Sequence, residues 1–117
     1  MSASKLNSFN ANNIPISGVV VGSYEDVSNY SSINVSVIIT GSNGQLYIYY
    51  TNDITQIQFV DYPPIEILDS TPITINSVVK SKYLLVKFVN NSSNIVNSLN
   101  VYTALNWSPD NPLPWLL

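Results

Sequence analysis

The chain has 117 residues, which is enough for one domain with its own hydrophobic core. Hydrophobic residues make up 45% of it, but only 9% are charged, against about 25% in an average globular protein. It has no histidine, no cysteine and no arginine, and its net charge is −3. This composition excludes Ser–His and Cys–His catalysis, zinc, haem and iron–sulfur sites and disulfide bonds, and it disfavours nucleic-acid binding. We therefore expect a protein that is not an enzyme and needs no cofactor.

Polarity comes from serine and asparagine, while isoleucine and valine supply most of the apolar content. Disordered chains are poor in β-branched residues, so this composition indicates a folded domain. No segment is long and apolar enough to span a bilayer, and the first residues lack the apolar core of a signal peptide. We expect no membrane contact and synthesis without a signal peptide.

In chain order, residues 1–13 form a polar segment that predicts an extended N-terminal arm. Beyond it, apolar and polar residues alternate, and turn signals interrupt the alternation about every eight to twelve residues, as in all-β proteins. The stretch Gly41 to Gly44 is the strongest hairpin signal. The most apolar predicted strand directs Leu84, Val86 and Phe88 to the core. The predicted strands are 14–21, 33–40, 46–51, 54–60, 65–68, 73–79, 83–89 and 99–105.

About eight antiparallel strands predict a single two-sheet β-sandwich, most simply a jelly roll. An immunoglobulin-like sandwich is the alternative, but the chain lacks the Cys–Trp–Cys spacing of that fold. The sandwich domain then spans residues 14–105, with a Pro- and Trp-rich C-terminal arm at residues 106–117.

Four stretches together resemble a β-sandwich module of structural proteins in double-stranded DNA viruses and phages. They are VSNYSSINVSV (27–37), GQLYIYYTND (44–53), KYLLVKFVNN (82–91) and LNVYTAL (99–105). The module usually carries arginine around the tyrosine of its penultimate strand, where this chain has Lys82 and Lys87. The resemblance implies a non-catalytic capsid, fibre or tail component that works as an oligomer.

The C-terminal arm holds the candidate interface residues. Three prolines keep this segment extended and out of a β-ladder, and tryptophan is a common interface anchor. The segment either docks on a neighbouring subunit or folds back over its own sheet. The residues expected to make these contacts are Trp107, Leu113, Trp115, Leu116 and Leu117.

A second candidate site combines aromatic and acidic residues. Tyr47 and Tyr49 share the face of their strand opposite the predicted core, where they could stack on a sugar, a base or a protein. Asp61, Glu66 and Asp69 flank a Pro-Pro turn and could solvate it, hold calcium or act as a carboxylate pair. In a carbohydrate- or receptor-binding module, Tyr47, Tyr49, Asp61 and Asp69 would form the ligand patch.

These observations predict a non-enzymatic virion structural protein, such as a minor capsid, cement or fibre-type subunit. Its partners would be further copies of itself, with a trimer favoured, and other virion proteins. A surface poor in charge fits this prediction, because uncharged groups cost little to desolvate when subunits pack. The alternative is a carbohydrate- or receptor-binding β-sandwich on a viral or bacterial surface.

Overall fold

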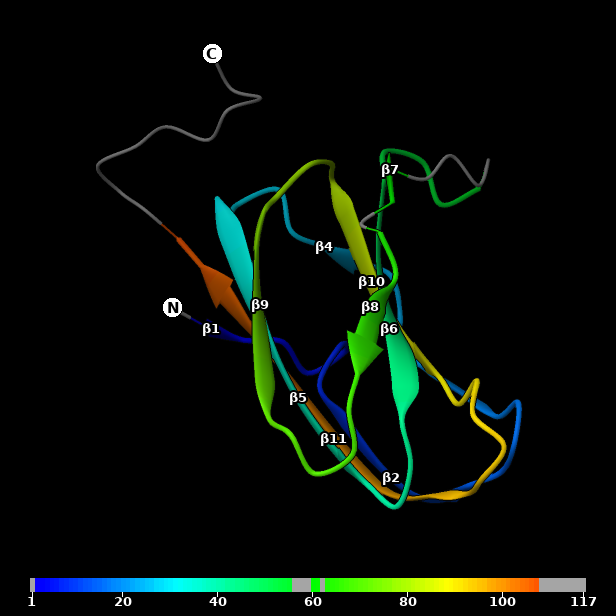
Figure 1. The fold of residues 1–117 in the computed structure, drawn as a ribbon. Coiled ribbons are helices and arrows are strands. Elements are labelled where there is room, and N and C mark those ends of the chain that lie inside the picture. The colour runs from blue at the N-terminus through cyan, green and yellow to red at the C-terminus, as the bar shows by residue number, and fades with distance from the viewer. Residues whose placement is uncertain (1, 56–59, 62, 108–117) are drawn as a thin grey trace.

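The computed structural model describes residues 2–55, 60–61 and 63–107, and these residues form two antiparallel β-sheets packed as a sandwich (Figure 1). Within these ranges there is no helix, and so no helix that could cross a membrane. The strands are β1 (Ser2–Ala3), β2 (Phe9–Ile14), β3 (Val19–Val21), β4 (Glu25–Asp26), β5 (Ser32–Thr40), β6 (Gly44–Thr51), β7 (Val60–Asp61), β8 (Ile65–Ile67), β9 (Ile73–Val78), β10 (Tyr83–Val89) and β11 (Val96–Asn106).

The strand order is that of a jelly roll. In sheet A, β1 and β2 pair end to end with β11, which pairs with β5, which pairs with β9. In sheet B, β3 and β4 pair with β10, which pairs with β6, which pairs with β7 and β8. If each of the pairs β1/β2, β3/β4 and β7/β8 is counted as one interrupted strand, the described residues form eight strands. The first pairs with the last and the second with the seventh, as in a jelly roll. The predicted two-sheet sandwich is confirmed.

The core lies between the sheets and follows from the alternation of the long strands. Leu84, Val86 and Phe88 of β10 are fully buried, as predicted. The inward residues of β5, β6 and β11 complete the core: Ile33, Val35, Val37, Ile39, Leu46, Ile48, Tyr50, Leu99, Val101 and Leu105. The buried Tyr50 hydroxyl lies 3.0 Å from Ser77 Oγ of β9, so this hydrogen bond joins sheet B to sheet A.

The predicted strand at 14–21 is wrong. Ile14 ends β2 in sheet A and Val19 begins β3 in sheet B, and a turn between them carries the chain from one sheet to the other. Ser17 adopts a positive φ of 65°, and Gly18 N donates to the Pro15 carbonyl at 2.8 Å. Proline lacks the N–H that a strand would use, and the Ser-Gly pair accepts the turn geometry.

The predicted hairpin at residues 41–44 is also wrong. The chain does reverse there, but β5 belongs to sheet A and β6 to sheet B, so the two strands do not pair (Figure 1). Gly41 has a φ of 99°, which requires glycine. A Cβ on Gly44 would lie 2.3 Å from Phe88 Cζ, so glycine also permits close packing at the start of β6. Turn residues specified the reversal without specifying the pairing partner.

Two further predictions are revised in part. Residues 1–13 were expected to form an arm, but β1 and β2 pair with β11 of the same chain and so belong to sheet A. The strand expected at 54–60 lies mostly outside the described residues. Of it, residues 54 and 55 lie in a turn and Val60 belongs to β7.

Asn7 ties the N-terminal segment to both sheets from a fully buried position. It lies beside the gap between β3 and β4, where β10 has no strand partner on that side. Its Oδ1 accepts from Val86 N at 2.9 Å, and its Nδ2 donates to the Ser23 carbonyl at 3.0 Å. In sheet A, Thr103 Oγ1 donates to the Asn7 carbonyl at 2.7 Å. One carboxamide therefore replaces part of the missing strand pairing.

Candidate functional site

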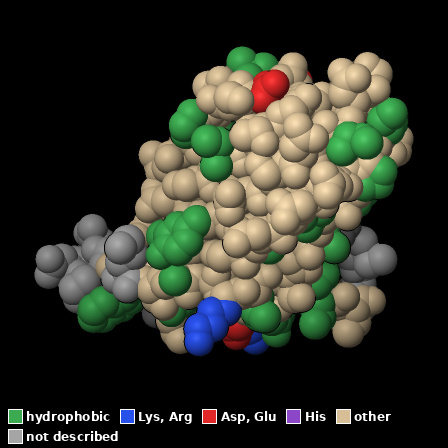
Figure 2. All heavy atoms as spheres, turned by 90° about the horizontal axis from the view of Figure 1, so that it is seen from below, with side chains coloured by type: hydrophobic (Ala, Val, Ile, Leu, Met, Phe, Trp, Pro, Cys, Tyr) green, Lys and Arg blue, Asp and Glu red, His purple; other side chains and the backbone are tan. Residues whose placement is uncertain are grey.

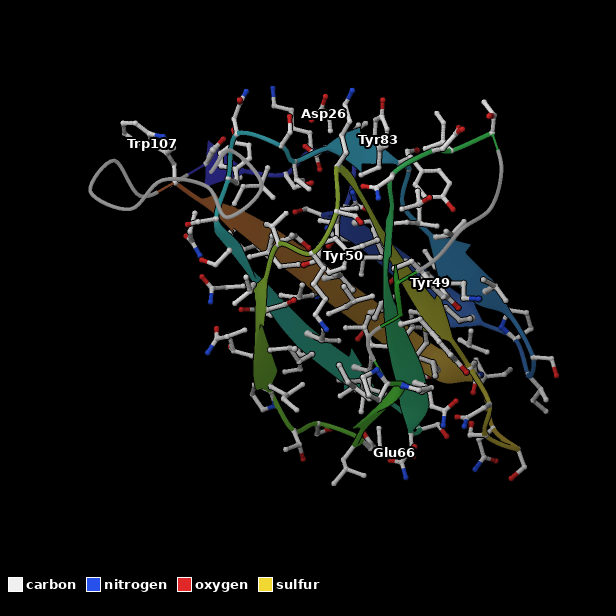
Figure 3. All side chains as sticks on the ribbon, turned by 90° about the horizontal axis from the view of Figure 1, so that it is seen from above. Asp26, Tyr49, Tyr50, Glu66, Tyr83 and Trp107 are labelled. Carbon is white, nitrogen blue, oxygen red and sulfur yellow. The ribbon has the colours of Figure 1, made fainter. Side chains whose placement is uncertain are left out.

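Tyr47 and Tyr49 form a stacked pair on the outer face of sheet B. Their rings lie 5.9 Å apart between centroids and are inclined by only 8°. Both are half-buried, whereas Tyr50 points into the core on the opposite side of β6 (Figure 3). The pair therefore lies on the outward face that the alternation of β6 predicted.

Lys87 places its charge against this pair. It lies on β10 directly opposite Tyr47, and its Nζ is 4.7 Å from the Tyr47 ring centroid and 5.0 Å from that of Tyr49. Such cation–π contacts contribute about 0.5–1 kcal/mol at exposed sites. Burial raises the pKa of Tyr24, and the electrostatic effect of Tyr49 raises it further.

The acids expected beside the tyrosines are not all brought to them. Asp61 lies on β7 opposite Tyr49 in the strand register. Asp69 instead follows β8 at the connection between β5 and β6, where its carboxylate accepts from Gly41 N at 3.0 Å and Ser70 Oγ at 2.8 Å. Glu66 is exposed opposite Gln45. In the described part of the chain no three acidic groups come together as a possible metal site.

Trp107 follows β11 and is 59% exposed, apart from the tyrosine pair (Figure 3). It borders a shallow hollow that Ser2, Asn29 and Tyr30 also line. This end of the sandwich therefore offers a large apolar side chain to solvent. The other predicted interface residues lie outside the described residues: Leu113, Trp115, Leu116 and Leu117.

A groove crosses the outer face of sheet A, and sequence reasoning missed it. Its volume is about 630 Å³, and residues of β2, β11, β5 and β9 line it, together with Ser8 and Pro72. Two cross-strand rows run through it. One row places Asn10, Asn100 and Ile38 side by side, and the other places Tyr102, Ser36 and Thr74 side by side.

Among the described residues, none that lines this groove is charged. The view in Figure 2 likewise shows uncharged groups over most of one side of the molecule, with charged side chains near its margins. The outward parity of Asn, Ser and Thr in these strands was visible in the sequence. Their meeting in one groove depends on strand order, which the sequence does not show.

No family model and no curated protein sequence matches the chain. Its fold has solved relatives. The chain is similar to PirA with a TM-score of 0.64 at 9% identity, over 86% of this chain and 96% of PirA. It is also similar to a protein of Bacillus endospore appendages, described as a novel family of disulfide-linked pili. That match has a TM-score of 0.50 at 7% identity, over 87% of each chain. These similarities support the two-sheet fold.

Proposed function

We propose that this chain is a non-enzymatic structural subunit that associates with further copies of itself through the outer edge of β9. The observation that supports this proposal is that β9 is an edge strand without charged residues. Within the described residues β9 pairs with β5 on one side only. Four of the six residues in its sequence, ITINSV, are β-branched, and the strand contains no charge and no proline. An uncharged edge strand of this kind is a template for pairing with another chain.

The strand register shows which backbone groups face outward. Val79 N donates to the Ser31 carbonyl at 3.0 Å, so this residue pair is hydrogen-bonded across the two strands. Antiparallel pairs alternate between hydrogen-bonded and non-hydrogen-bonded. Thr74 and Val78 stand at non-hydrogen-bonded positions opposite Ser36 and Ser32. The N–H and C=O groups of Thr74 and the N–H of Val78 therefore point away from β5, where a further strand could pair with them. The Val78 carbonyl also accepts a hydrogen bond from Ser77 Oγ at 2.9 Å.

The other edges are less suited to pairing. On sheet B, β7 and β8 have two and three residues, and Pro63 and Pro64 lie between them. β3 and β4 are equally short. On sheet A, β2 has three asparagines among six residues and carries Asn13 at a positive φ of 53°. Asparagine is depleted in strands, so β9 is the favoured edge.

A second copy fits this edge by symmetry. When two copies of β9 pair antiparallel with Ile75 opposite its counterpart, each residue lies opposite one whose side chain points to the same face of the sheet. Buried Ile75 and half-buried Ile73 then continue the inner face, and Thr74 continues the outer face. The two copies of sheet A form one continuous sheet, with a dimer as the smallest assembly.

The finer assignment to a virus particle rests on the sequence resemblance to virion β-sandwich modules. The appendage protein of similar fold supports an assembly role, because its printed description is that of a pilus. Its pili are disulfide-linked, but this chain has no cysteine, so its own contacts are non-covalent. The C-terminal arm would add contacts with other virion proteins or with further copies of the dimer. The two-fold pairing of β9 edges replaces the trimer that the sequence favoured.

Light scattering on the full chain and on Val78→Lys tests the proposal. Val78 is 60% exposed on β9, and lysine on an edge strand is a known device against edge pairing. We expect an oligomer for the unmodified chain and a monomer for Val78→Lys. Val21→Lys is the matched control, since Val21 is 52% exposed on sheet B and should leave the oligomer intact. A monomeric unmodified chain, or equal masses for all three proteins, would overturn the proposal.

A further inference from the structure

We propose that the groove on sheet A is a binding site for a neutral saccharide. This inference is independent of the assembly role, because it concerns the face of the sheet and not its edge. The described residues that line the groove include no lysine, aspartate or glutamate. Phosphate, carboxylate and ammonium ligands would therefore lose hydration without gaining a charged partner. An uncharged polar ligand avoids this cost.

The groove offers polar groups of the kind that hydroxyl-rich ligands need. Asn10 and Asn100 are exposed and lie opposite each other in the strand register. Neither side chain makes a hydrogen bond to the part of the chain that the structure describes. Each carboxamide can donate and accept hydrogen bonds, and so can a sugar hydroxyl. Ser36 Oγ and Thr74 Oγ1, 3.2 Å apart, keep further bonding capacity beyond the bond that they share.

The groove also offers an apolar surface beside these groups. Tyr102 is 49% exposed in the row next to the asparagines, and Ile38 is half-buried opposite Asn100. An aromatic ring can pack against the C–H face of a sugar while hydroxyls at the ring edge reach the amides. The volume of about 630 Å³ falls within the range of small-molecule sites.

The tyrosine pair of sheet B is less suited to this ligand. Tyr47 and Tyr49 stack on each other, and Lys87 covers part of both rings. Both tyrosines are half-buried, whereas Tyr102 is exposed. The carbohydrate site that the sequence located at Tyr47 and Tyr49 is therefore better placed on the opposite sheet.

The test is an NMR titration of the ¹⁵N-labelled full chain. The probes are the methyl glycosides of glucose, galactose, mannose and N-acetylglucosamine, their disaccharides, and N-acetylneuraminic acid as a charged comparison. We expect at least one neutral probe to shift the amide signals of Asn10, Ser36, Asn100 and Tyr102. Tyr102→Ala should weaken that binding by about tenfold or more, and Asn100→Asp should weaken it similarly because it replaces an amide donor by a charge.

Two matched controls separate this site from the rest of the molecule. Asn12→Asp adds the same charge at an exposed position of β2 that does not line the groove, and Tyr49→Ala removes a ring from sheet B. Both should bind as the unmodified chain does. Val78→Lys should also bind, whether or not the chain assembles. No shift with any neutral probe, shifts centred on Tyr47 and Tyr49, or equal shifts with N-acetylneuraminic acid would each overturn the proposal.

Discussion

Replacing Asn7 should destabilise the domain far more than its place in a polar, asparagine-rich segment suggests. Asn7→Ala removes the acceptor for the buried Val86 N–H and the donor for the Ser23 carbonyl. The buried Val86 N–H left without a partner costs about 1–3 kcal/mol, and the lost bond to the part-buried Ser23 carbonyl costs about 1 kcal/mol more, which gives a loss of about 2–4 kcal/mol in the free energy of unfolding. That loss should lower the melting temperature by roughly 10–20 °C in a domain of this size.

Urea denaturation followed by circular dichroism measures this loss, with Asn12→Ala as the control. Asn12 is exposed on β2 and should change stability by less than about 0.5 kcal/mol. Asn7→Asp is the sharper variant. It keeps an oxygen for Val86 but removes the amide donor and brings a second carboxylate next to that of Glu25, to which Asn7 Nδ2 donates at 3.2 Å. Unchanged stability in Asn7→Ala or Asn7→Asp would refute the reasoning.

Three further predictions concern the turns and the C-terminal arm. Gly44→Ala should lower the melting temperature, because its Cβ would lie 2.3 Å from Phe88 Cζ; a scan by calorimetry that showed no change would contradict this close packing. Hydrogen bonds from the side chain and then the backbone of Ser28 lower the pKa of Asp26 below 3.8. These hydrogen bonds stabilise the folded state fully at pH values above the pKa of Asp26 in the unfolded chain, and the stabilisation is lost as the pH falls through its lower pKa in the folded state. The free energy of unfolding of Asp26→Asn should therefore fall less steeply in acid than that of the unmodified chain. A chain ending at Asn106 should form smaller assemblies by light scattering if the arm docks on neighbours, whereas unchanged mass would favour an arm that covers its own sheet.

The alternating pattern predicted the inner face correctly because successive side chains of a strand point to opposite faces, so every second residue is buried in the core. Ile33 to Ile39 and Leu84 to Phe88 are examples. The pattern could not distinguish a hairpin from a crossing between sheets, since Gly41 and Gly44 serve both. It could not show the groove either, because Asn10, Asn100 and Thr74 are far apart in the sequence and meet only through strand order.

Asn7 shows a second limit of the sequence. Its neighbours are polar, and nothing in composition separates this buried carboxamide from exposed ones such as Asn12. It is buried because the segment between β1 and β2 of sheet A fills the gap between β3 and β4 of sheet B. The tyrosine pair was predictable by contrast, because alternation along one strand places both rings on one face.

Amide hydrogen exchange at the β9 edge tests the central claim most directly. The N–H groups of Thr74 and Val78 point away from β5 and have no partner among the described residues, so pairing with a further strand should protect them. We predict that both exchange slowly in concentrated protein and become fast on dilution or in Val78→Lys, while the inward-paired amide of Ile75 remains protected throughout. Fast exchange at Thr74 and Val78 in an assembled protein, or slow exchange in a monomer, would contradict assembly through this edge.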